Sequence, residues 1–200
     1  MGGAFSVTIT VTDVAGASVS QIYTLSLTAA PAGTISSVTL ANTGGTAGRI
    51  VPGDTITVVF SSQMSVSSLC STWSNDANNQ SLTANGDVVV TVTDGTGVTN
   101  DSLSVNSGTC TFNFGSVGLG SNAYLTGGAV TFSGNGANAS KINWTAGSNT
   151  LTITLGSKHG SGTMATVASS APTYTAGPIT TSLGGTLSNS PFALGNGQQF

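Results

Sequence analysis

Strict alternation of apolar and polar residues is the feature that most constrains how this chain can fold. In residues 5–11 every second residue is apolar and the residues between are Ser or Thr, and residues 23–27 repeat the pattern. A period of two is typical of a β-strand that buries one face. Because Asp13-Val14-Ala15-Gly16 between the two runs has the composition of a turn, residues 5–28 are predicted to form a β-hairpin. The apolar positions of this hairpin are Phe5, Val7, Ile9, Val11, Tyr23, Leu25 and Leu27.

Short runs of Val, Ile and Thr continue along the rest of the chain, separated by clusters of Gly, Asn, Asp and Pro. Helical spacing of apolar residues extends no further than about two turns, and residues 64–73 are its best example. Many short strands with turn signals between them predict an all-β fold, an antiparallel sandwich or barrel with few or no helices. The further predicted strands are residues 35–40, 55–60, 88–93, 102–105, 109–114, 129–132, 141–144, 151–155, 164–167 and 192–194.

The low content of charged residues excludes several classes of function. Asp, Glu, Lys and Arg make up 4% of the chain, against about 25% in an ordinary globular protein. Three basic residues cannot form a surface that neutralises phosphates, so we expect no nucleic-acid partner. Disorder is not expected either, because 38% of the residues are hydrophobic and the net charge is only -3. Residues 1–30 contain neither signal-peptide segments nor a membrane-spanning run, so we expect no membrane insertion.

Cys70 and Cys110 are the two cysteines of the chain, and neither belongs to a CxxC pair. This spacing argues against a zinc site or a thioredoxin-type redox motif. We predict a disulfide between them, which would close a loop of about 40 residues and contribute about 3–4 kcal/mol by loop entropy. The alternative is a pair of buried free thiols that act as small apolar groups. A disulfide favours an oxidising, extracellular location.

The predicted hairpin needs a packing partner, because a lone two-stranded hairpin is at best marginally stable in water. Three arrangements are open. The hairpin forms the last two strands of a preceding repeat, packs on the sandwich of its own chain, or completes the sheet of another subunit by strand addition. A short linker rich in Ala and Pro follows it, so we divide the chain into an arm, residues 1–32, and a sandwich, residues 33–200.

Two stretches of sequence resemble known bacterial families. Residues 6–28, with an alternating strand, a T-D-x-x-G turn and a second strand, resemble the end of bacterial cadherin-like or putative Ig repeats. Residues 53–69 contain G-D-T-I-x-V-x-F-S followed by M-x-x-x-S-L, which is similar to the opening of the S-layer type of bacterial Ig-like domain. Members of that family usually carry Glu or Lys and Pro where this chain has Ser62 and Gln63. The resemblance implies an Ig-like β-sandwich that acts as a non-catalytic module of cell-surface, secreted or phage virion proteins.

Catalytic residues are scarce in this sequence. Ser-His-Asp chemistry requires a base, and His159 is the one histidine, in a glycine-rich segment that we interpret as a solvated turn. Glycoside hydrolysis requires two carboxylates, one of them in an apolar pocket. All six Asp residues lie in turn signals, where we expect them to be solvated and to bond local backbone N–H groups. We therefore expect no enzymatic activity. The six Asp residues are Asp13, Asp54, Asp76, Asp87, Asp94 and Asp101.

Calcium is the one cofactor that the sequence leaves open, and we expect no other. The ion needs six to eight oxygen ligands, and no D-x-D-x-D-G run is present. Asp94 and Asp101 lie seven positions apart in a loop-like segment and could share a cation with carbonyl oxygens.

Aromatic side chains offer a second kind of binding site, a platform on which sugars stack. The candidates are Trp73, Trp144, Tyr124 and Tyr174. Trp144 alternates with Ile142 and is predicted to belong to the core, whereas Trp73 lies in a polar segment and is predicted to be exposed.

Together these features predict a structural protein that builds or decorates an extracellular surface, filament or virion through β-sheet contacts, with copies of itself as the expected partners. Uncharged Thr, Ser and Asn faces favour this role, because two such faces can pack closely without charge repulsion. The alternative is an adhesive or carbohydrate-binding Ig-like module that binds glycans as part of a larger secreted protein.

Overall fold

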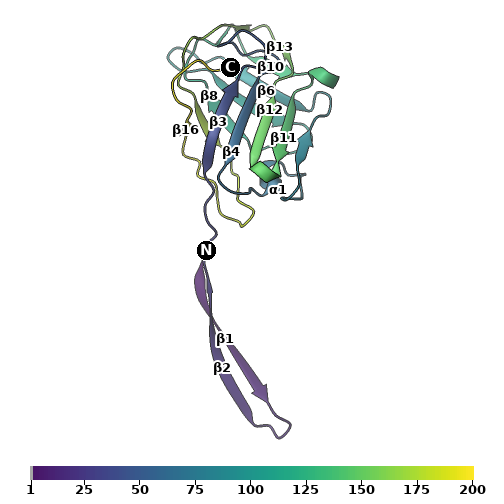
Figure 1. Ribbon diagram of the computed structural model, residues 1–200, viewed down its shortest axis with the longest axis vertical. Helices are drawn as coiled ribbons and strands as arrows, with labels where there is room; N and C mark the ends of the chain where they lie inside the picture. Colours follow the sequence, from purple (N-terminus) through teal and green to yellow (C-terminus); the bar gives the residue numbers. More distant parts are fainter. Residues whose placement is uncertain (1) are drawn as a thin grey trace.

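The computed structural model describes residues 2–200 and is almost entirely β (Figure 1). Helix in this part of the chain is limited to one α-helical turn, α1 (Val66–Leu69), and two 3₁₀ turns, η1 (Gly136–Asn138) and η2 (Ala146–Ser148). The α-helical turn lies inside residues 64–73, where the sequence predicted it. No helix of the described chain is long and apolar enough to cross a membrane.

One sheet of the sandwich has five strands in the order β3-β4-β12-β11-β5, and every neighbouring pair is antiparallel. Its strands are β3 (Ile35–Ala41), β4 (Thr55–Phe60), β12 (Thr150–Thr154), β11 (Lys141–Thr145) and β5 (Gln80–Leu82).

The second sheet has seven strands in the order β13-β10-β6-β7-β8-β15-β16, also antiparallel throughout. A two-stranded ladder of β9 (Leu125–Thr126) and β14 (Thr163–Met164) is not hydrogen-bonded to either large sheet, although its Leu125 and Met164 belong to the same core. The strands of the seven-stranded sheet are β13 (Ser157–His159), β10 (Val130–Ser133), β6 (Val88–Thr93), β7 (Ser102–Ser107), β8 (Gly115–Gly118), β15 (Thr173–Ala176) and β16 (Phe192–Ala193).

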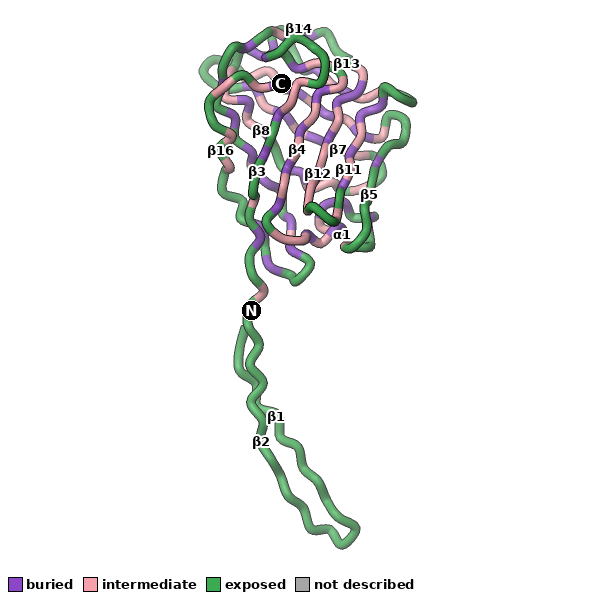
Figure 2. The backbone as a smooth tube through the Cα atoms, viewed as in Figure 1, coloured by how far each residue is buried: buried purple, intermediate pink, exposed green. Residues whose placement is uncertain are grey.

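The core is built from the alternate apolar residues of both sheets. In β4 the residues Ile56, Val58 and Phe60 are buried while their Thr and Val neighbours are half-buried, and β6 and β12 show the same alternation. Figure 2 shows buried and half-buried residues alternating along the strands of the sandwich. The predicted all-β antiparallel sandwich with few helices is confirmed.

The hairpin is the one part of the described chain that stays outside this core. Strands β1 (Gly3–Thr12) and β2 (Ser18–Leu27) form a separate two-stranded sheet, and every residue of both strands is exposed. The ribbon projects away from the sandwich (Figure 1). Packing of the hairpin on its own sandwich, one of the three arrangements open from the sequence, is therefore wrong for this structure.

Most predicted strands are present, and β4 and β6 have the predicted bounds. Residues 109–114 are not a strand, because their backbone bonds the end of α1 and the loop after it: Asn113 N–H donates to Leu69 O at 2.8 Å, and Ser71 N–H donates to Thr111 O. The predicted strand 164–167 is reduced to the end of β14. Five short strands were not predicted from the sequence: β5, β8, β9, β13 and β15.

Candidate functional site

The hairpin is a regular ladder of ten antiparallel pairs. Phe5 lies opposite Leu25, Val7 opposite Tyr23, and Ile9 opposite Gln21. Because paired residues share a face and successive residues alternate faces, all the predicted apolar positions lie on one face. Val19, opposite Val11, joins them. We call this set the apolar face: Phe5, Val7, Ile9, Val11, Val19, Tyr23, Leu25 and Leu27.

The apolar face has no cover in the described chain. Its side chains have exposed fractions between 46% for Val7 and 71% for Val19. The opposite face consists mainly of Ser and Thr, with Ile22 as its one large apolar residue, and Thr10 and Ser20 hydrogen-bond across it at 2.7 Å. Exposed apolar patches of this kind are typical of protein or membrane interaction sites.

The turn of the hairpin is closed by Asp13, as its sequence predicted. The backbone N–H groups of Ala15 and Ala17 both donate to Asp13 Oδ1 at 2.9 Å, and Asp13 N–H donates to Ala17 O. Gly16 has a φ of 88°, which a glycine adopts without strain. Asp13 is the only charged side chain in residues 2–32, so the hairpin surface is otherwise neutral.

The sandwich presents no comparable apolar surface. Within residues 33–200 the exposed large apolar side chains are Val98 and Leu183, which are isolated loop residues. Its outer faces instead carry rows of polar side chains placed side by side by strand register. One row crosses the five-stranded sheet through Thr39, Thr57, Thr152, Asn143 and Ser81, and another crosses the seven-stranded sheet through Thr131, Thr91, Ser104, Ser116 and Thr175.

Cys70 and Cys110 form the predicted disulfide, with a Cα–Cα distance of 5.5 Å. The bond joins the end of α1 to the segment before β8, and Cys70 pairs with Phe112 in an isolated bridge. It therefore ties two loops at one end of the sandwich.

His159 lies on a strand rather than in the predicted turn. It ends β13, an edge strand of the seven-stranded sheet, and pairs with Thr131. Its side chain is exposed, as predicted, and its imidazole forms no hydrogen bond with another described residue. The structure thus provides no catalytic triad around this histidine among residues 2–200.

The prediction that all six Asp side chains are solvated is wrong for Asp54 and Asp101, which are completely buried. Asp54 accepts hydrogen bonds from the backbone N–H groups of Val51 at 2.8 Å and Thr43 at 3.2 Å. Burial raises the pKa of Asp54, and these two N–H bonds partly oppose the rise. The carboxylate holds the loop between β3 and β4 together, which is a structural role.

Asp94 and Asp101 both accept hydrogen bonds from backbone N–H groups. Asp101 Oδ1 accepts from Gly95 N–H and its Oδ2 from Leu125 N–H, both at 2.9 Å. Asp94 Oδ2 accepts from Gly127 N–H at 3.1 Å. In the described chain no group of three or more His, Cys, Asp or Glu residues could hold a metal. The two carboxylates are engaged with backbone donors and connect loops at one end of the sandwich.

The four aromatic candidates for a sugar platform are buried: the predicted core position of Trp144 is confirmed, and the predicted exposure of Trp73 is wrong. Trp73 exposes 6% of its surface and packs edge-on against Phe112, with ring centroids 6.5 Å apart. Trp144, Tyr124 and Tyr174 are also core residues, and Tyr174 Oη donates to Phe114 O at 2.7 Å. The residues next to Trp73 in the sequence are polar, so its burial could not be predicted from them. The burial results from the adjacent disulfide loop.

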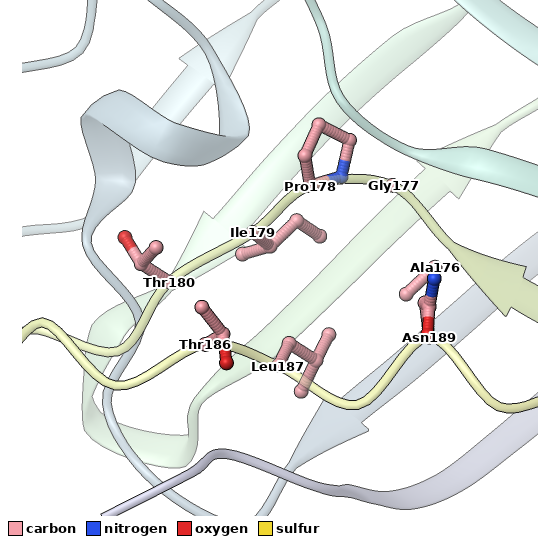
Figure 3. Close-up of a pocket in the computed structure, with 8 residues that line it drawn as sticks. All are labelled: Ala176, Gly177, Pro178, Ile179, Thr180, Thr186, Leu187 and Asn189. Atoms are coloured by element: carbon pink, nitrogen blue, oxygen red, sulfur yellow. The ribbon is translucent and has the colours of Figure 1, made fainter. Parts of the chain in front are cut away.

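A pocket with a volume of about 480 Å³ lies between residues 176–180 and 186–189 (Figure 3). The two segments are joined by a hydrogen bond from Leu187 N–H to Ile179 O at 2.9 Å. No titratable side chain is among its lining residues, which include Pro178, Thr180 and Asn189. This pocket offers no acid, base or metal ligand, so the hairpin remains the strongest candidate site.

Comparison of the chain with protein-family models, with curated proteins and with solved structures found no match in any of the three. The resemblance to S-layer-type and cadherin-like Ig domains stays a prediction from the sequence motifs.

Proposed function

We propose that this protein is a non-enzymatic structural module of a bacterial extracellular surface, filament or phage virion, and that it joins a neighbouring molecule through the hairpin β1–β2. The uncovered apolar face is the observation that carries this proposal. Eight large apolar side chains lie on one side of a two-stranded sheet that pairs with no other described strand. Such a sheet gains stability only when another surface covers it.

The sandwich supports the same role. Nearly all large apolar residues of the sandwich lie in its core. The Cys70–Cys110 bond suits an oxidising, extracellular environment. The rows of Thr, Ser and Asn on its outer faces carry no charge, so neighbouring modules can approach without desolvating ions.

The placement of polar groups also favours a structural role over catalysis. Asp54 and Asp101 use their oxygens to bond backbone N–H groups, and His159 stands alone at a sheet edge. An active site instead gathers such groups in one cavity. The alternative of carbohydrate binding loses its proposed platform, because Trp73 and the other three aromatic candidates are buried.

Light scattering tests the proposal on the full chain and on a chain that begins at Gly33. The shorter chain retains both large sheets, the disulfide and the Gly33–Leu187 bridge, and β1–β2 shares no strand pairing with it. We expect the full chain to associate with increasing concentration and the shorter chain to remain a monomer with an unchanged melting temperature. A full chain that stays monomeric at every concentration would contradict the proposal.

A further inference from the structure

We propose that the apolar face of the hairpin packs against the same face of the hairpin of a second copy, with the two hairpins antiparallel. This inference rests on the proposed function and names the partner. The sandwich of a second copy cannot serve as the cover, because Val98 and Leu183 are its exposed large apolar residues in the described chain and neither belongs to an apolar face. Within this protein, the matching surface for one apolar face is another apolar face.

The area of the contact is large enough for a specific dimer. Each of the eight side chains is about half-exposed, and a large side chain has roughly 200 Å² of surface. Two facing hairpins would therefore cover up to about 1,600 Å² in total, which is the size of a standard protein interface. Pairing two hairpins edge to edge would leave both apolar faces in contact with water. Face-to-face packing is the arrangement that removes the apolar faces from water.

The position of the single charge selects the antiparallel orientation. Asp13 lies at the tip of the hairpin, ten pairs away from the linker to the sandwich. Parallel hairpins would bring two Asp13 carboxylates together and the two sandwiches side by side. Antiparallel hairpins place each Asp13 near the neutral linker of the other copy, about 33 Å from its counterpart at the usual rise of a strand.

The polar group on the apolar face is compatible with this contact. Gln21, opposite Ile9, is the one residue of this face with a polar amide, and its Nε2 donates to the backbone O of Ile22 at 3.3 Å. One amide hydrogen bond is thus made within its own strand. The hydroxyl of Tyr23 lies at the end of a long ring, which can reach water at the rim of the contact.

The contact has two-fold symmetry and is closed, because the same surface is used by both copies. The resulting unit has a four-stranded connector of two packed layers, with one sandwich at each end. In a surface or filament, this connector would set the spacing between neighbouring sandwiches.

A matched pair of charge variants tests the packing. Val7 lies on the apolar face and Thr8, its neighbour, lies on the opposite face. We expect Val7→Lys to weaken dimerisation roughly 100-fold, because it buries an unpaired charge. Thr8→Lys adds the same charge to the same strand and is expected to change dimerisation less than about threefold, since surface charges act weakly. Sedimentation equilibrium measures both constants.

Cross-linking tests the geometry independently. Both cysteines of the chain are in the disulfide, so an introduced cysteine is the sole reactive thiol. Val7 is near the middle of the apolar face, and facing sheets lie about 10 Å apart. We expect a short bis-maleimide to join two copies of Val7→Cys and to leave Thr8→Cys monomeric on denaturing gels.

The outcomes separate this inference from the proposed function. If the full chain associates but both lysine variants associate equally well and Val7→Cys does not cross-link, the face-to-face dimer is wrong while a structural role through another contact stands. Loss of association only on deletion of the hairpin would then indicate edge pairing. A monomeric full chain would overturn the inference and the proposed function together.

Discussion

Val7 and Tyr23 lie directly opposite each other in the hairpin ladder, yet they expose 46% and 55% of their surfaces. A cross-strand pair of this kind contributes about 0.2–1 kcal/mol. Ordering the backbone of one residue costs about 1–2 kcal/mol, and the hairpin orders two ten-residue strands. The cross-strand pairs of an uncovered hairpin therefore cannot offset the loss of chain entropy by themselves.

Hydrogen exchange should reveal this imbalance. In a dilute monomer we expect the amides of β1 and β2 to exchange quickly, while the amides of β4 and β12 in the core sheet stay protected. At a concentration where the chain associates, the amides of β1 and β2 should become protected as well. Mass spectrometry of peptides from the two regions measures both. Strong protection of β1 and β2 in a proven monomer would show that the hairpin needs no partner.

The strands that could be predicted are those with one buried face and a complete alternation. Ile56, Val58 and Phe60 alternate with less buried residues, and the bounds of β4 follow directly from that pattern. The hairpin was predictable for the same reason, together with the turn chemistry of Asp13. Alternation reveals which residues share a face, but not what covers the face, so the partner of the hairpin stays a prediction.

Strands defined mainly by their partners could not be predicted. Residues 115–118 are Gly-Ser-Val-Gly, which reads as a turn, and they form β8 because β7 and β15 pair with them on both sides. His159 becomes a strand residue through pairing with Thr131, far away in the sequence. The burial of Asp101 likewise requires that loops carrying Gly95 and Leu125 meet around it. These are long-range contacts that local patterns do not encode.

Removing the disulfide should destabilise the sandwich without affecting the hairpin. The Cys70–Cys110 bond spans 40 residues, and the loop-entropy estimate for such a span is about 3–4 kcal/mol. We expect the double variant Cys70→Ala with Cys110→Ala to melt roughly 6–15 °C lower than the parent chain. Reducing agent should lower the melting temperature of the parent and leave that of the variant unchanged. Equal melting temperatures would mean that the bond adds no stability.

Asp54 should make stability depend on pH. Because burial raises its pKa above the ordinary value of 3.8, the folded protein holds this proton more tightly than the unfolded chain does. The contribution of Asp54 to the free energy of unfolding is therefore fully present below pH 3.8 and is lost as pH rises through the raised pKa of the folded state.

The variant Asp54→Asn provides the reference for this pH effect, because its side chain does not ionise. We expect the parent chain to be more stable than the variant throughout, because an amide cannot accept from both Val51 and Thr43 N–H groups with the same geometry. The advantage should be largest near about pH 3 and smaller near about pH 7. Urea denaturation across this range measures it, and an advantage that grows with pH would contradict the expected direction.

Asp101 and Asp94 should differ sharply in their effect on stability, although they lie in the same loop. Asp101→Ala leaves the N–H groups of Gly95 and Leu125 without their acceptor at a completely buried position, which we expect to cost about 2–4 kcal/mol. Asp94 is only half-buried, so Asp94→Ala should cost about 0.5–1 kcal/mol. Urea denaturation of both variants measures the difference.

Adding calcium or a chelator to the parent chain should leave its melting temperature unchanged, because both oxygens of Asp101 already accept backbone hydrogen bonds. A rise in melting temperature with calcium that Asp101→Ala abolishes would instead identify a cation site at this loop.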